Sequence, residues 1–185
     1  KRWTRKLAGV LAQNDITVVS GMAEGIDTQA HLGCLEKNGN TIAALGTGTD
    51  IAYPPRNQTL HQQISERGLV LSEYPAGTQP NRAHFPRRNR IIAALSRATL
   101  VMEAPQRSGA LITAYMANDY GRDVYVLPGT LDNPRATGCL GLMTKGAQLI
   151  LGEGHLLELL GTIPALDRPQ TIAAPVYMPN VSPEL

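Results

Sequence analysis

The stretch that decides the fold is Ile16-Thr17-Val18-Val19-Ser20-Gly21-Met22-Ala23-Glu24-Gly25-Ile26-Asp27. It opens with a short run of apolar and β-branched residues, which is typical of a buried strand. Small residues then interrupt the run, and a helical pattern follows through residues 28–37. A strand, a glycine-containing loop and a helix in succession form the repeating unit of α/β folds.

The same succession repeats along the chain. We expect strands at 16–19, 41–45, 69–72, 99–102, 124–127 and 148–150, and helices at 1–13, 28–37, 58–67, 87–96, 110–120 and 153–160. The strands are continuous apolar runs, as expected when helices cover both faces of a sheet. The predicted fold class is therefore α/β, with a doubly wound, mostly parallel sheet. Such sheets bind ligands outside the carboxyl ends of their strands.

Length and composition indicate one compact domain, because the chain has 185 residues and 43% of them are hydrophobic. We expect the α/β domain to occupy residues 1–161 and to lack a strand before its first helix. Residues 162–185 are rich in proline, and we interpret them as a linker toward a further domain that is absent here. The sequence contains neither a signal-peptide pattern nor an apolar run of the ~20 residues that a membrane span needs. A cytoplasmic protein is the expectation.

The charge pattern is the most informative feature for function. The formal net charge is only +2, but no acidic residue lies between Glu73 and Glu103. Arginine side chains neutralise phosphates and release counterions, and an aromatic face can stack a base. This segment therefore suggests a contact with single-stranded nucleic acid, centred on Phe85. The arginines of the segment are Arg82, Arg87, Arg88, Arg90 and Arg97.

The same residues also allow a purely structural interpretation. Phe85 could be a plug in the core, and the arginines could form a solvated helix face. Helical spacing does not allow all the arginines to face one ligand. We expect at least one of them to pair with a carboxylate such as Glu73 or Glu103.

Three other places could bind an anion. Gly21 lies between a strand and a helix, where backbone N–H groups and the helix dipole favour a phosphate, but a tight turn explains its glycine equally well. Ser108 and Gly109 open a helix beside Arg107, with Ser108 as the expected N-cap. Lys145 is a weaker candidate near the start of another strand.

Catalytic and metal-binding patterns are poor. The histidines are scattered, and Asp27 and His31, one helical turn apart, are expected to stabilise the loop–helix junction. Cys34 and Cys139 are far apart and suggest neither zinc nor a disulfide framework. We therefore expect no catalytic residue, no metal and no cofactor, and a protein that is not an enzyme.

Two nucleotide-directed functions remain as alternatives. A nucleoside-monophosphate phosphoribohydrolase would carry a Pro-Gly-Gly-x-Gly-Thr loop followed by a catalytic Glu, whereas this chain has Pro128-Gly129-Thr130-Leu131. A dinucleotide-binding module would need an acidic residue at the end of the second strand, where Leu45-Gly46 stands.

Several motifs in order resemble the DprA/Smf family (DNA processing protein A). They are Ser20–Asp27 with His31, Tyr53-Pro54, Leu71–Pro75, Phe85–Ile92, Ser108-Gly109, Pro128-Gly129, Gly138-Cys139 and Lys145–Ala147. The resemblance implies an extended Rossmann-like fold and a homodimer without established catalytic activity. It further implies binding of incoming single-stranded DNA in natural transformation (competence), protection of that DNA, and loading of RecA for DNA recombination.

The resemblance also implies which residues contact the DNA. The family uses a basic residue three positions before the Phe, the Phe itself, and a basic residue before Ser-Gly, which are Arg82, Phe85 and Arg107 here. Its first strand and the Gly-Ser-Arg loop after it are not found in this sequence, and Leu140 stands where many members have Asn. We expect some of the arginines 87, 88 and 90 to serve the fold. The full set of expected nucleic-acid-binding residues is Gly21, Arg82, Phe85, Arg87, Arg88, Asn89, Arg90, Arg107, Ser108, Gly109 and Lys145.

Overall fold

The computed structural model describes residues 1–161, so the expected linker at 162–185 lies outside the described residues. The strands are β1 (Val18–Ser20), β2 (Thr41–Leu45), β3 (Leu69–Ser72), β4 (Ala98–Val101), β5 (Asp123–Val126) and β6 (Gln148–Leu149). The helices are α1 (Arg2–Gln13), α2 (Ile26–Glu36), the short 3-10 helix η1 (Pro55–Asn57), α3 (Gln58–Arg67), α4 (His84–Leu95), α5 (Gly109–Asp119), α6 (Thr137–Met143) and α7 (Glu153–Gly161). This alternation confirms the predicted α/β class.

The strands form two parallel sheets, in the orders β1-β2-β3 and β4-β5-β6. In the first sheet Ser20 is in register with Ala43, and Leu45 with Ser72. In the second, Val101 is in register with Val126. Because all pairs are parallel, the loops that follow β1, β2 and β3 leave from one edge of their sheet.

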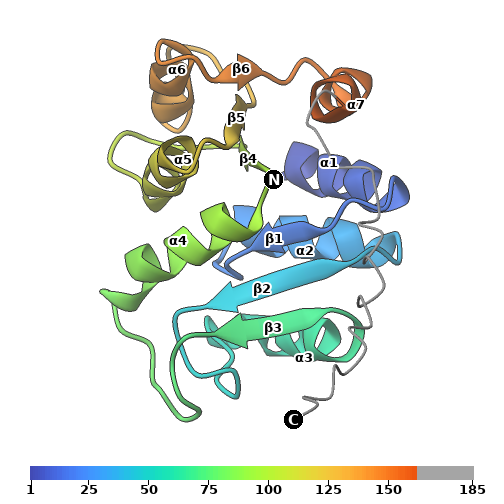
Figure 1. Cartoon of the computed structure of the whole chain (residues 1–185), viewed down its shortest axis with the longest axis vertical. Coiled ribbons are helices and arrows are strands. Elements are labelled where there is room, and N and C mark those ends of the chain that lie inside the picture. Colours follow the sequence, from blue (N-terminus) through green and yellow to red (C-terminus); the bar gives the residue numbers. More distant parts are fainter. Residues whose placement is uncertain (162–185) are drawn as a thin grey trace, which may run out of the picture.

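One continuous sheet is the sequence-based expectation, and the structure differs from it. Within residues 1–161, β1 pairs with β2 and β4 pairs with β5, but no strand lies between β1 and β4. A cleft of about 850 Å³ separates these two edges and is lined by both of them. Figure 1 shows the two sheets in the lower and upper halves of the molecule.

Helices hold the two halves together. In Figure 1, α2 and α3 lie behind the first sheet and α4 lies in front of it, in contact with β1 and β2. Helix α1 packs on α2, and its Leu7 and Leu11 belong to the same core cluster as Tyr125 of β5 and Leu156 of α7. Within the described residues, none of the helices combines the length and the apolar character that a bilayer crossing requires.

Helix α4 begins three residues earlier than the sequence pattern predicts, at His84 instead of residue 87. The Asn81 side chain accepts a hydrogen bond from Ala83 N (2.9 Å), and the Asn81 carbonyl accepts one from His84 N (3.0 Å). Pro86 then falls in the first turn, where its missing N–H leaves no helical bond unmade. Phe85 therefore lies on a helix and not on a loop.

Candidate nucleic-acid interface

The candidate interface lies where the loops after β1, β2 and β4 meet the first turns of α4 and α5. Here the cleft is lined by Tyr53, Phe85, Arg88, Asn89 and Gly109. These residues come from three separate segments of the sequence. The fold thus brings the loop after β2, the arginine-rich segment and the Ser108-Gly109 turn to one region, as the carboxyl-end rule predicts.

The loop after β1 satisfies its own polar groups. The Asp27 Oδ2 atom accepts hydrogen bonds from the backbone N–H groups of Gly21 and Ala23, each at 3.2 Å. The chain's own carboxylate therefore occupies the place in which the sequence predicts a phosphate at Gly21. The same bonds replace the predicted Asp27–His31 contact, because His31 instead bonds Thr41 Oγ1 through Nδ1 at 2.7 Å.

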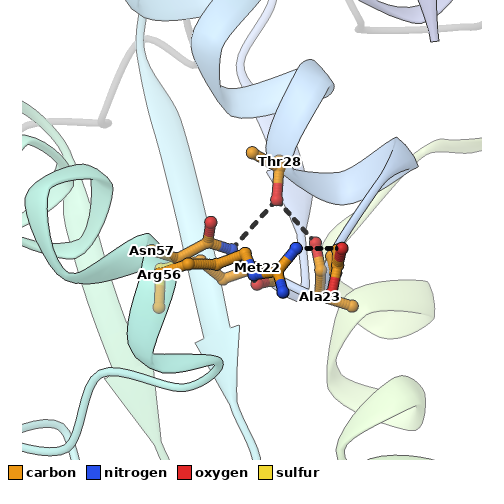
Figure 2. Close-up of polar contacts among 6 residues, drawn as sticks. Met22, Ala23, Thr28, Arg56 and Asn57 are labelled. Atoms are coloured by element: carbon orange, nitrogen blue, oxygen red, sulfur yellow. Dashed lines mark hydrogen bonds and ion pairs between the residues drawn. The ribbon is translucent and has the colours of Figure 1, made fainter.

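Figure 2 shows how residues of η1 and α2 also hold the loop after β1 in place. The Asn57 Nδ2 atom donates to the Met22 carbonyl and to Thr28 Oγ1, both at 2.9 Å, and Thr28 Oγ1 donates to the Ala23 carbonyl at 2.8 Å. Met22 has a φ of +58°, a left-handed conformation that is uncommon for a residue other than glycine. The side chains of Asp27, Thr28 and Asn57 all bond the backbone of this loop. The shape of the loop is therefore set before any ligand binds.

Arg88 serves the fold, which corrects its assignment as a nucleic-acid contact. Its side chain is buried, and Nη1 donates to the carbonyls of Gly21 (2.6 Å) and Ala44 (2.5 Å). Nε donates to Asn89 Oδ1 at 3.2 Å. Burial lowers the pKa of the Arg88 guanidinium, and the nearby Asp27 carboxylate opposes that shift. Arg88 ties β1 and β2 to α4, so its donors point into the protein.

Phe85 lies half-buried in the first turn of α4, with one ring edge against the backbone of Gly46. A Cβ at position 46 would come within 2.9 Å of Phe85 Cδ1, so glycine is required there. Tyr53 stacks on Phe85 with ring centroids 5.5 Å apart and an interplanar angle of 22°. The neighbouring His84 stacks on Tyr74 at 4.0 Å and bonds the Gly46 carbonyl through Nδ1 at 3.0 Å. Phe85 thus combines the two sequence interpretations, since it packs inward and also lines the cleft.

The remaining arginines of the segment divide as expected. Arg90 pairs with Glu73 at 2.8 Å, which confirms the predicted contact with a carboxylate. Glu103, the other predicted partner, lies 3.6 Å from Arg135. Arg82 and Arg87 are exposed around the first turn of α4, and Arg107 is exposed before α5 with a φ of +60°. These three residues are exposed, and so is Arg97, which lines the cleft. Each of these cations could meet a phosphate.

The amino terminus of α5 adds a partial positive charge. Ser108 occupies the N-cap position, but its side chain makes no capping hydrogen bond, contrary to the role predicted for it. Its Oγ atom is buried and has no hydrogen-bond partner within the described part of the chain. Asn89 Nδ2 donates to the Gly109 carbonyl at 3.3 Å and so joins α4 to this turn. The first turn of α5 carries no acidic residue that would repel an anion.

Lys145 lies elsewhere. Its Nζ atom donates to Tyr115 Oη at 3.2 Å and sits 4.7 Å from the centroid of the Tyr115 ring. Neither residue lines the cleft. Within residues 1–161, Lys145 makes no side-chain hydrogen bond or ring contact with another of the predicted residues.

One histidine and both cysteines are buried. His31 is fully buried, and burial lowers its pKa to about 4. Cys34 and Cys139 are buried free thiols, and burial raises the pKa of each. In the part of the chain that the structure describes, His, Cys, Asp and Glu side chains do not gather into a group that could hold a metal ion.

Sequence patterns do not predict the contacts of three residues in this region. Tyr53 is expected only as part of a motif of the family resemblance, and Asn57 is assigned no contact. Asp27 is paired with His31 and not with the backbone of Gly21 and Ala23. The stacking of Tyr53 on Phe85 joins residues 32 positions apart and has no local signature.

The comparisons with known proteins agree with this architecture. The family model for DNA recombination-mediator protein A matches residues 1–161. Protein Smf of Synechocystis sp. is 57% identical over 169 residues, which are 91% of this chain and 42% of that protein. The X-ray structure of DNA processing protein A from Streptococcus pneumoniae has a TM-score of 0.79 and 43% identity, and the match covers 85% of this chain and 55% of that one.

A second structure, of DNA processing protein A from Helicobacter pylori, was described for its single-stranded DNA binding mode. It has a TM-score of 0.76 and 34% identity, with 86% of this chain and 72% of that chain covered. The chain spans 42% and 52% of the curated relatives from Synechocystis sp. and S. pneumoniae, about half of their length.

Proposed function

Because the chain belongs to the DNA recombination-mediator protein A family, we propose that it binds single-stranded DNA across the first turns of α4 and α5. The observation that carries the proposal is the stacking of Tyr53 on Phe85 in a segment rich in exposed arginines. Arg82 and Arg87 flank Phe85 in the sequence, and exposed Arg107 precedes α5. The H. pylori relative, whose single-stranded DNA binding mode has been described, supports single-stranded DNA as the ligand.

Binding of this kind follows from two independent interactions. Each exposed arginine neutralises one phosphate and releases a counterion, so the logarithm of affinity falls with the logarithm of salt by about 0.7 per phosphate. The α5 amino terminus adds partial positive charge without a competing carboxylate. An aromatic ring stacks any base, so little sequence preference is expected.

The wider role rests on the family resemblance. We propose that the protein protects incoming single strands during natural transformation in the cytoplasm and helps to load RecA, as a homodimer. We further propose that it acts by binding and not as an enzyme. The buried positions of His31 and of both thiols support this, because these groups cannot reach a substrate from the cleft.

The test is a fluorescence anisotropy titration of labelled oligothymidylate at several salt concentrations. We expect binding that weakens with salt, and weaker binding for Arg82→Ala, Phe85→Ala and Arg107→Ala. Lys37→Ala is the matched control, since it removes one exposed positive charge at the opposite end of α2, just before β2 begins. Wild-type affinity in all three site variants would overturn the site, and no binding by the wild-type protein would overturn the function.

A further inference from the structure

Phe85 has little free ring surface for a base. Its edge lies against Gly46, the Arg88 guanidinium lies 5.9 Å from its ring centroid, and Tyr53 stacks on it. Each of these neighbours occupies surface that an incoming base would need. Phe85 is therefore better placed to support another ring than to receive a base itself.

Tyr53 keeps the free surface that Phe85 lacks. It is 40% exposed, lines the cleft, and lies next to Pro54 at the end of the loop after β2. Within residues 1–161 its hydroxyl makes no hydrogen bond that would tie the ring to a neighbour. One face of the Tyr53 ring meets Phe85, which leaves the other available.

The loop that carries Tyr53 is anchored at several points. Thr47 Oγ1 donates to the Ile51 carbonyl at 2.9 Å, Gly48 N donates to the Thr78 carbonyl at 3.0 Å, and the Asp50 carboxylate accepts from Gly77 N at 2.8 Å. A ring held in place loses little conformational entropy when a base stacks on it. These hydrogen bonds thus preorganise the loop, so that the Tyr53 ring is held in position for stacking.

We propose that Tyr53 is the outer ring of a two-ring platform, on which a base of the bound single strand stacks, and that Phe85 supports Tyr53 from below. This inference rests on the proposed function, and it names a contact beyond the expected set. The ligand is an unpaired base of any identity, because each base offers a π-face. Arg82 and Arg87, on either side of Phe85 in sequence, would hold the phosphates that flank that base.

The salt dependence of binding separates this contact from a charge contact. Stacking releases no counterion, so Tyr53→Ala should lower the affinity for oligothymidylate roughly 5- to 100-fold at every salt concentration without changing the slope. Arg82→Ala should instead flatten the slope by about 0.7. Tyr53→Phe keeps the ring and should bind as the wild type does. Tyr120→Ala is the matched control, because Tyr120 is also exposed (46%) but does not line the cleft.

A second measurement locates the base directly. Oligonucleotides with one 5-bromouracil should form a photochemical cross-link to Tyr53, identified by peptide mass spectrometry, and the cross-link should vanish in Tyr53→Ala. If Tyr53→Ala binds as tightly as the wild type while Arg82→Ala and Phe85→Ala bind weakly, the platform is wrong and the proposed function stands. If the wild-type protein binds no oligonucleotide, the function and the platform fall together.

Discussion

Arg88 and Gly21 fit together so closely that a side chain at position 21 has no room. The Arg88 Nη1 atom donates to the Gly21 carbonyl at 2.6 Å, and a Cβ at position 21 would lie 2.5 Å from the guanidinium carbon. Position 21 must therefore be glycine, because the buried Arg88 guanidinium occupies the space that a side chain would need. The sequence pattern alone does not separate this from a phosphate-binding glycine.

Gly21→Ala should destabilise the fold strongly. The added methyl group would displace the Arg88 guanidinium and leave the carbonyls of Gly21 and Ala44 without their donor, at a cost of about 2–4 kcal/mol. Urea unfolding followed by circular dichroism measures the change. Gly141→Ala is the control, because a Cβ there meets nothing within 4 Å on helix α6 and should be neutral or slightly stabilising. Equal stability of the two variants would contradict the packing role of Gly21.

Asn57→Ala should also destabilise the protein, through the loop after β1. It removes the donor to the buried Met22 carbonyl, and an unsatisfied buried acceptor costs about 1–3 kcal/mol. Asn57→Asp should be no better, since a carboxylate offers that carbonyl no proton. The neighbouring change Arg56→Ala breaks only the exposed pair with Glu24 and should alter the unfolding free energy by a few tenths of a kcal/mol. A thermal unfolding series of the three variants would show whether this order holds.

His31 should make stability depend on pH. Burial lowers its pKa from 6.5 to about 4 in the folded state, with opposing effects from Asp27, which raises it, and Arg88, which lowers it. Below pH 6.5 the His31 imidazole becomes protonated in the unfolded chain, whereas in the folded chain it stays neutral down to about pH 4. The neutral, buried His31 therefore contributes fully to the free energy of unfolding above pH 6.5. This contribution, on the order of 3 kcal/mol, is lost as the pH falls to about 4.

The unfolding free energy of the wild type and of His31→Gln, measured by urea titration across this pH range, tests the prediction. The wild type should lose stability more steeply than the variant as the pH falls. Parallel curves for the two proteins would show that His31 is not responsible.

Local patterns were sufficient for most of the fold. The strands at 41–45 and 69–72 and the helix at 58–67 have the boundaries predicted, because apolar runs and helical spacing are local properties. The division into two sheets was not predictable in this way. Strand pairing depends on which edges meet in space, and the cleft between β1 and β4 has no counterpart in any single stretch of sequence.

The site was predictable as a region and less so residue by residue. The absence of acidic residues between Glu73 and Glu103 correctly marks an arginine-rich surface. It does not show that Arg88 turns inward, because the carbonyls that bind it come from the loop after β1 and from β2. Nor does it show Tyr53, whose position depends on the packing of a distant loop on α4.

Glu73→Gln should strengthen the binding of single-stranded DNA. The carboxylate of Glu73 holds Arg90 at 2.8 Å, and both side chains are partly exposed at the end of β3. Removing the negative charge frees Arg90 for a phosphate and relieves repulsion of about 0.5–1 kcal/mol, a gain of roughly two- to five-fold at low salt. The salt slope should steepen by about 0.7 if Arg90 gains a phosphate.

Glu66→Gln removes the same charge from the exposed surface of α3 and serves as the control. It should leave the slope of the anisotropy titration unchanged, because Glu66 accepts a hydrogen bond from Gln62 on its own helix and holds no arginine. If Glu73→Gln binds more weakly than the wild type, the ion pair positions Arg90 for the DNA. In that case Arg90 contacts a phosphate while Glu73 still holds it, and both residues belong to the binding surface.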